Sequence, residues 1–331
     1  MAGRRTNLAL LVALAAATGT GVLAFAIGTG ANGWTTFAHS VAGLAIVLLT
    51  PWKSLIVRRG LRRQRPHTGT SVLLSVLVVF ALAAGLLHSS GIASHLGSVS
   101  AMQLHVGAAL AALPLALWHV RTRRVRMHRT DMARRQALKA GALLGGAAVV
   151  YAGLESIFHI ASLPGAERRF TGSLERGSMN PEAMPVTQWL DDRVPTLDGD
   201  RMSIEIAGRD WSIGELTPYD DRVRATLDCT GGWFAEQDWA GVWLDRVVDT
   251  RRGARSLVVI SATGYSRRFP IRDASKLLLA TRVAGDVLSP GHGYPARIVA
   301  PGRRGFWWVK WITRIETSDR PWWLQLPFPP T

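Results

Sequence analysis

Five long apolar segments fill the first half of the chain and constrain its fold more than any other feature. They lie near residues 7–28, 35–57, 70–89, 101–120 and 140–162. Each is about the length that a helix needs to cross the hydrocarbon core of a bilayer. Inside a bilayer every backbone polar group must be bonded internally, so such runs are helical. Residues 1–163 are therefore predicted to form an all-α transmembrane bundle of about five helices.

The distribution of charge predicts how this bundle is oriented. Residues 1–163 contain 16 Lys and Arg but two acidic residues, whereas residues 164–331 contain 23 Lys and Arg and 21 Asp and Glu. In the first half the basic residues cluster between alternate pairs of apolar segments, and the loops 28–33 and 89–100 contain none. Because cytoplasmic loops carry such an excess, we expect a cytoplasmic N-terminus and, after five crossings, a C-terminal domain on the outer face.

The same distribution excludes nucleic acid as a partner, despite the formal net charge of +16. A phosphate-binding surface would concentrate positive charge on a folded soluble domain. Here the excess belongs to short clusters between apolar runs. We therefore expect a multi-pass protein of the cell membrane whose first partner is the lipid bilayer.

The second half of the chain has the composition of a soluble domain. Residues 164–331 are rich in Pro, Gly, Trp and charge, and short alternating runs such as 202–206 and 256–260 predict strands. The length is sufficient for one core. We predict a multi-domain protein, with a helical transmembrane domain over 1–163 and an α+β domain over 164–331.

The chain contains one cysteine, Cys229, in the run Leu-Asp-Cys-Thr-Gly-Gly-Trp at 227–233. A lone thiol cannot form an intrachain disulfide. It can serve as a small buried hydrophobe, as a nucleophile or as a soft metal ligand. The residue type alone leaves these alternatives open.

The surrounding motifs resemble the sulfite oxidase family of molybdopterin enzymes. Residues 292–311 run His-Gly-Tyr-Pro-Ala-Arg, an apolar strand, Pro-Gly and Val-Lys-Trp, which is similar to that family's most characteristic stretch. The segment around Cys229 resembles the part that supplies the molybdenum thiolate, and residues 264–271 resemble the part with an active-site tyrosine. Together with the opening segment at 180–187, the resemblance covers about residues 170–317.

This resemblance implies a sulfite oxidase-type fold that binds molybdenum–molybdopterin and performs two-electron oxygen-atom transfer on a small-molecule substrate. A thiolate suits molybdenum as a soft donor, and the phosphate of the pterin requires fixed cationic donors. Each of these residues also has a structural alternative. Tyr265 could be a tyrosine of the core, Lys310 could point outward, and His292 and Arg297 could belong to a structural turn. By resemblance the catalytic residues are Cys229 and Tyr265, the metal ligand is Cys229, and the cofactor-binding residues are Asn180, Cys229, His292, Arg297 and Lys310.

One segment departs from the family. Sulfite-oxidising relatives carry a cationic Asn-Arg-Arg run after the cysteine, whereas this chain has Gly-Gly-Trp-Phe at 231–234. The change argues against sulfite and favours a less cationic pocket. The substrate is left open.

Histidines in the apolar half suggest a second redox centre. Ionisable side chains at membrane depth are costly and often functional. His39 and His105 lie at similar depth in the second and fourth segments, and paired histidines on facing helices hold iron in cytochrome b-type bundles. We predict one haem b between them, with His88 as a substitute ligand. The alternative is that these histidines only line the ends of a plain anchor.

The functional prediction combines the two halves. We expect a membrane-anchored molybdopterin-dependent oxidoreductase that works on the outer face and exchanges electrons with a quinone or another membrane carrier. The pair Arg134-Arg135 resembles a twin-arginine export signal, although it also fits an ordinary positive flank of the fifth helix. The alternative function is a non-enzymatic membrane protein whose outer domain keeps the fold as a binding module.

Overall fold

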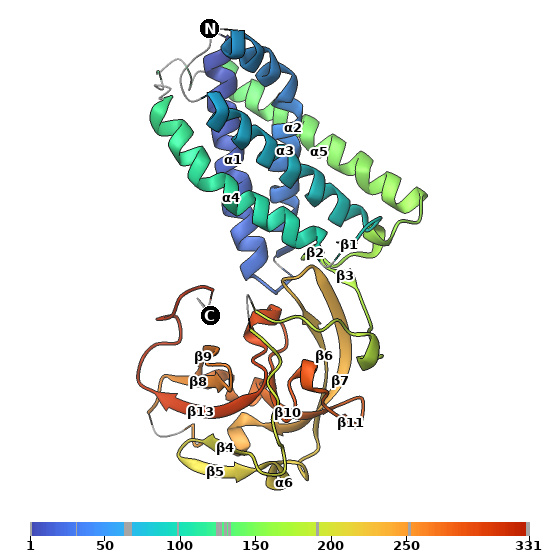
Figure 1. Ribbon diagram of the computed structural model, residues 1–331, viewed down its shortest axis with the longest axis vertical. Coiled ribbons are helices and arrows are strands. Elements are labelled where there is room, and N and C mark those ends of the chain that lie inside the picture. The colour runs from blue at the N-terminus through green and yellow to red at the C-terminus, as the bar shows by residue number, and fades with distance from the viewer. Residues whose placement is uncertain are drawn as a thin grey trace. The chain divides into compact units, whose positions relative to one another are not determined.

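Figure 1 shows a computed structural model, which describes residues 2–30, 32–62, 68–97, 99–123, 128, 131, 134–189, 192–250 and 253–328. Parts of the basic clusters near 53–65 and 121–139 lie outside these residues. The chain divides into two compact units. The first comprises Met1–Phe25 and Gly30–Leu174, and the second comprises Ala26–Thr29 and Glu175–Thr331.

The first unit is a set of five long helices, in agreement with the predicted fold class (Figure 1). All five are long and apolar enough to cross a membrane. Many of their large apolar side chains are exposed and few are buried, as expected of surfaces that meet lipid. The helices are α1 (Ala2–Ala26), α2 (Asn32–Arg62), α3 (Thr68–Ser90), α4 (Ala101–Thr122) and α5 (Arg134–Ile160).

Local sequence explains how these helices begin and pack. Ser100 caps α4 and forms a capping box with Gln103, which satisfies two backbone N–H groups at the start of that helix. A short hairpin of β1 (His95–Leu96) and β2 (Val99–Ser100) precedes it. Helix α3 packs along α4, and α2 packs along α5. Ala45 and Ala147 are fully buried where the second pair meets, because small residues let helices approach closely.

The second unit contains two antiparallel-rich sheets (Figure 1). One has five strands in the order β5-β4-β13-β8-β9, with β13 parallel to β4. Its strands are β4 (Ser203–Ile206), β5 (Arg209–Ser212), β8 (Ser256–Ser261), β9 (Ser266–Pro270) and β13 (Ile312–Ser318). A one-turn helix, α6 (Ile213–Leu216), follows β5.

The other sheet positions the candidate site. Its path is β11-β10-β7-β3, with β6 paired to β7 and β12 paired to β10. Its strands are β3 (Leu174–Glu175), β6 (Asp221–Asp228), β7 (Trp233–Trp243), β10 (Leu278–Val283), β11 (Asp286–Val287) and β12 (Arg297–Val299). Short 3-10 helices complete this unit, at Pro181–Ala183, Leu244–Arg246, Ile271–Lys276, Pro290–His292 and Gly305–Trp307, and another belongs to the first unit, at Pro164–Glu167.

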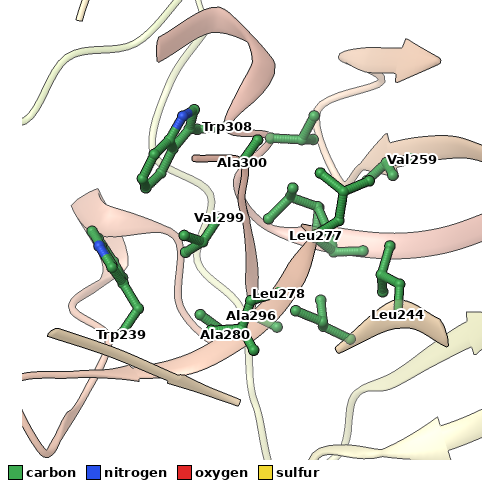
Figure 2. Packing of buried hydrophobic residues seen from close by; sticks show 14 of the residues in the cluster. Trp239, Leu244, Val259, Leu277, Leu278, Ala280, Ala296, Val299, Ala300 and Trp308 are labelled. Atoms are coloured by element: carbon green, nitrogen blue, oxygen red, sulfur yellow. The ribbon is translucent and has the colours of Figure 1, made fainter. Parts of the chain in front are cut away.

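A single apolar core underlies both sheets. Figure 2 shows part of it, where Leu278 and Val299 on paired strands point into the same cluster as Trp239 and Trp308. The two indole rings meet edge to face with centroids 5.7 Å apart. This contact joins β7 to the segment after β12, so the core rigidly connects the two chain segments that carry Cys229 and the downstream motif.

Candidate active site

Cys229 lies in the tight turn between β6 and β7. The ladder of these strands runs up to Asp228 opposite Phe234, so the cysteine begins the turn immediately after the last pair. Its N–H donates to the carbonyl of Trp233 over 2.9 Å, which closes the turn. The residue is 8% exposed. The Gly231 N–H donates to Sγ over 3.3 Å, so the backbone fixes the position of the sulfur.

A buried ion pair holds the base of this turn. Arg304 Nη1 and Asp228 Oδ1 are 2.5 Å apart, and both side chains are 3% exposed. Arg304 also donates from Nη2 to the carbonyl of Cys229 over 3.3 Å. The next residue, Gly305, has no room for a side chain, because a Cβ would lie 3.0 Å from the Cα of Cys229. The sequence interpretation did not identify Arg304 or Asp228.

The protein environment alone does not ionise the thiol. Burial raises the pKa of Cys229, and the Gly231 amide and the Arg304 charge only partly oppose this effect. A neighbouring metal ion would enforce deprotonation, as it does for coordinating thiols in general.

A pocket with about 680 Å³ of empty space, including the part open to solvent, adjoins the sulfur. Its lining combines one thiol, a few cationic groups and many aromatic rings. Among the predicted site residues it includes Cys229, Tyr265, His292, Arg297 and Lys310. The aromatic residues are Trp189, Trp233, Phe306, Trp308 and Trp311. The fold therefore brings together side chains separated by more than 80 positions in the sequence.

Arg297, on β12, is a buried cation without a carboxylate partner in the described part of the chain. It is 2% exposed and donates to the carbonyls of His292, over 3.0 Å, and Trp308, over 3.3 Å. Its Nε is buried with no hydrogen-bond partner among the described residues. Burial lowers the pKa of Arg297 to about 9. Such a desolvated charge is costly unless an anion balances it.

Lys310 supplies a second cation to the same pocket. Its Nζ donates to the carbonyls of Thr187, over 2.9 Å, and Gly291, over 3.0 Å, and lies over the ring of Trp311. Burial first, and then the nearby charge of Arg297, lower the pKa of Lys310 to about 7. Lys310 thus points inward, and the alternative of an outward-facing lysine does not apply.

His292 lies at the pocket wall with both ring nitrogens engaged. Nε2 lies 3.0 Å from the carbonyl of Met184, so Nε2 is the donor there, and Nδ1, 2.8 Å from Ser289 Oγ, accepts from that hydroxyl. Burial and the charge of Arg297 lower the pKa of His292, which favours this neutral form. In this arrangement the imidazole ties the 3-10 helix Pro290–His292 to the segment at Met184.

Tyr265, between β8 and β9, lines the pocket with its hydroxyl turned to the protein. The O–H donates to the carbonyl of Phe306, and burial raises the pKa of the phenol. The ring packs edge-on against Trp189, with centroids 6.3 Å apart. A role near the reacting atoms stays a prediction.

Asn180 is not among the residues that line the pocket. It is exposed and caps the 3-10 helix Pro181–Ala183, where its Oδ1 accepts from the Ala183 N–H over 3.4 Å. A cofactor contact by Asn180 stays a prediction. A second amide, Gln188, does line the pocket, and its Nε2 is buried without a partner among the described residues.

In the first unit, the rings of His39 and His105 face each other edge to face with centroids 5.7 Å apart. Nδ1 of His39 lies 2.8 Å from the carbonyl of Ala17, and Nδ1 of His105 lies 2.8 Å from that of Ala81. A carbonyl only accepts, so both Nδ1 atoms are donors. Each imidazole therefore keeps its lone pair on Nε2, the usual orientation of a histidine that binds a metal.

Glycines make room for both rings. A Cβ on Gly21 would lie 3.0 Å from the His39 ring, and one on Gly85 would lie 2.9 Å from the His105 ring. His88, the predicted substitute, donates from Nε2 to the carbonyl of Gly172 over 3.0 Å. Its iron-binding nitrogen is thus occupied. The pair His39 and His105 is the better candidate for iron.

The described residues contain no cluster of three or more His, Cys, Asp or Glu placed to hold a metal ion. A metal at Cys229 would therefore need most of its ligands from a bound cofactor. The thiol, the uncompensated Arg297 and the inward Lys310 in one pocket fit such an anionic, metal-carrying group.

Comparisons with known proteins agree with this geometry. Residues 192–323 match the protein family described as oxidoreductase molybdopterin binding domain. This range contains Cys229, Tyr265, His292, Arg297 and Lys310. The prediction that the second half carries an oxidoreductase domain of the molybdopterin-binding type is therefore confirmed.

Individual relatives match over short stretches. The chain is 54% identical over 44 residues to an NADPH nitrate reductase of Mycosarcoma maydis, which is 13% of this chain and 4% of that protein. It is 26% identical over 167 residues to the mitochondrial sulfite oxidase of Rattus norvegicus, which covers 38% of this chain and 31% of that protein. The chain thus spans less than a third of either relative.

Among solved structures, the chain is similar to the sulfane dehydrogenase SoxCD from Paracoccus pantotrophus. The match has a TM-score of 0.36 and 23% identity, and it covers 38% of this chain and 40% of the other.

Proposed function

We propose that this chain, with its molybdopterin-binding oxidoreductase domain, is a membrane-anchored enzyme that performs two-electron oxygen-atom transfer on a small molecule. It exchanges electrons through its helical unit with a quinone or another membrane carrier. The observation that carries the proposal is the joint presence in one pocket of a backbone-oriented thiol and a buried arginine without a carboxylate partner.

In this proposal Cys229 ligates molybdenum, and Arg297 and Lys310 hold the phosphate end of the pterin. When bound, the cofactor supplies the oxygen-atom transfer and the change of two electrons. The protein supplies orientation and charge. Arg297 would use its unbonded Nε and its positive charge, and Lys310 would exchange a carbonyl contact for an anionic one. Gln188 adds a donor at the same wall.

The aromatic lining bears on the substrate. Trp189, Trp233 and Phe306 line the pocket that adjoins the sulfur, and the cationic lining groups are those assigned to the cofactor. Because aromatic walls disfavour a bare oxyanion unless donors compensate it, we favour a neutral small molecule over sulfite. The direction of the reaction is left to experiment.

The first test is a metal and pterin inventory of the full chain, purified in detergent from cells that supply the cofactor. We expect about one molybdenum and one pterin per chain. Preparations of the Arg297→Met and Lys310→Met variants should retain far less of both, because each loses a cation for the buried phosphate. A folded wild type without molybdenum or pterin would refute the enzyme proposal in favour of a binding module.

We further propose that His39 and His105 bind one haem b. Their ring separation, the Nδ1 donors on backbone carbonyls and the space left by Gly21 and Gly85 support this assignment. Each histidine would supply Nε2 to iron, and the haem would relay electrons in the helical unit.

Replacing either histidine by alanine should remove the b-type absorption. The reduced-minus-oxidised spectrum of His39→Ala and of His105→Ala should lose its Soret and α bands, while molybdenum content stays at the wild-type level. His95→Ala, in the exposed β1 strand, is the matched control and should keep the bands. A wild-type spectrum without these bands would leave the helices as a plain anchor.

The proposed location is the cell membrane, with five crossings, a cytoplasmic N-terminus and the oxidoreductase domain on the outer face. The five apolar helices and the clustering of basic residues support this topology. Arg134 and Arg135 begin α5 in the structure. Both the export signal and the positive flank of a helix are compatible with that position.

A further inference from the structure

The first four helices repeat the same arrangement at two levels. On α2, Lys53 follows His39 by 14 residues, and on α4, His119 follows His105 by 14 residues. The neighbouring helices keep this spacing, because Asn7 and Gly21 on α1, and Ser71 and Gly85 on α3, are also 14 residues apart. We call Gly21, His39, Gly85 and His105 the histidine level, and Asn7, Lys53, Ser71 and His119 the lysine level. At 1.5 Å per residue the two levels are about 21 Å apart.

Contacts across the helices connect the members of the lysine level. Lys53 Nζ donates to Asn7 Oδ1 over 3.0 Å, which joins α2 to α1. Ser71 Oγ lies 3.1 Å from Nδ1 of His119, which joins α3 to α4. The positive charge of Lys53 also acts unfavourably on His119, so the two residues influence each other across the helix pairs at this level.

This level carries cationic and donor groups but no carboxylate. Residues 1–163 contain two acidic residues, Asp131 and Glu155. Asp131 pairs with Arg4 at 2.5 Å, and Glu155 pairs with Arg168. Arg123 adds further positive charge near His119. Lys53 and His119 are both half-buried, and cationic donors at membrane depth are costly unless a ligand accepts hydrogen bonds from them.

The lysine level differs from the histidine level in the residues that α1 and α3 contribute to it. Gly21 and Gly85 leave room for the imidazole rings of the histidine level, whereas Asn7 and Ser71 place polar side chains at the equivalent positions and bond to Lys53 and His119. Because the Lys53 amine donates a hydrogen bond to Asn7, we do not expect its nitrogen to bind iron through a lone pair. The donors of this level suit a ligand that carries acceptor oxygens better than they suit a haem iron.

We propose that Lys53 and His119 bind the headgroup of a quinone. The two carbonyl oxygens of a quinone accept hydrogen bonds, Lys53 Nζ is a donor, and His119 Nε2 is one when Ser71 Oγ donates to Nδ1 of the same ring. The Lys53 amine reaches Asn7 on a neighbouring helix, so it faces the bundle and not the surrounding lipid. This inference rests on the proposed exchange of electrons with a membrane carrier and assigns that carrier a site.

The test is equilibrium binding of decylubiquinone and of menadione to the full chain in nanodiscs of phosphatidylcholine. We expect the wild type to bind one of them, and Lys53→Met and His119→Leu to weaken its binding at least 10-fold. Lys53→Arg should stay within about threefold of the wild type, because it keeps the donor and the charge. The controls are Ser54→Ala and Thr122→Ala, since among the described residues these hydroxyls bond to carbonyls of their own helices.

Three results would overturn the site. The first is wild-type affinity in both Lys53→Met and His119→Leu. The second is no binding of either quinone by a wild type with an intact absorption spectrum. The third is displacement of the quinone from the wild type by phosphatidylglycerol, which would assign the donors to a lipid phosphate. Haem and molybdenum content are measured on the same samples, so loss of either with quinone binding preserved would contradict the proposed function and not this site.

Discussion

Replacing Cys229 with serine should lower turnover by at least about 1000-fold, which corresponds to about 4 kcal/mol of transition-state stabilisation. Serine is nearly isosteric and can accept the same hydrogen bond from the Gly231 N–H. A hydroxyl, however, is a hard donor with a far higher pKa than a thiol, and it does not replace a thiolate on a soft metal. We expect the pocket to stay formed and the proposed bond from residue 229 to molybdenum to be lost.

Two measurements separate this effect from misfolding. The unfolding midpoint of Cys229→Ser should fall only modestly, because serine is similar in size and its hydroxyl keeps a hydrogen bond from the Gly231 N–H. Its pterin content should fall less than its activity, since Arg297 and Lys310 remain. The control is Thr230→Ser, one residue further along the turn. Wild-type turnover in Cys229→Ser would show that the thiol is only a small buried side chain.

Removing the Arg304 side chain should destabilise the second unit strongly. Arg304→Met leaves the carboxylate of Asp228 buried and without its charged partner, which typically costs about 3–5 kcal/mol. The double variant Asp228→Leu with Arg304→Met should recover most of that loss, because apolar groups of similar volume often replace a buried ion pair without penalty. The measurement is denaturant unfolding of the full chain, followed by tryptophan fluorescence.

The matched control is Arg314→Met, which breaks exposed ion pairs with Glu205 and Glu316. Such surface pairs contribute about 0–1 kcal/mol, so this variant should unfold near the wild-type midpoint. Equal losses of stability in Arg304→Met and Arg314→Met would contradict a special contribution of the buried ion pair between Arg304 and Asp228. If the double variant recovers its stability but not its molybdenum content, the ion pair between Arg304 and Asp228 also orients Cys229.

Sequence patterns predicted the helical half well, because a chain inside a lipid bilayer has few structures other than a helix that bond all of its backbone polar groups. The predicted segments each correspond to one helix, although α5 begins at Arg134 and not near 140. That difference arises because a polar first turn outside the apolar run can still be helical. Periodicity gives the apolar part of a membrane helix more reliably than its ends.

The pocket was predictable in its motifs but not in its supporting contacts. Cys229, Arg297 and Lys310 belong to recognisable runs, and the fold brings them together. Arg304 and Asp228 are 76 residues apart, and neither residue type signals a buried pair. The one available signal was the acid immediately before the cysteine, since an acid at the end of a strand in an apolar hairpin requires a partner.

The pair of His39 and His105 was predicted from their similar positions along the second and fourth apolar segments, whereas the orientation of the two rings required the structure. Spacing placed His39 and His105 at one level, but it could not give the Nδ1 contacts that orient the rings. The spacing also could not show that His88 is a poorer candidate for iron than His39 and His105. The contact of His88 with Gly172 depends on how the chain returns after α5. Long-range pairing of this kind is a property of the assembled helices.

Arg297 is buried without a carboxylate partner among the described residues, and this has a consequence for how the protein matures in a cell. A domain that buries a cation with no counter-charge is less stable when empty than when loaded, and ligand binding shifts its folding equilibrium by mass action. Empty copies would open more often and would be degraded sooner by proteases. The cell would thereby retain mainly loaded molecules, without any receptor that recognises the cofactor itself.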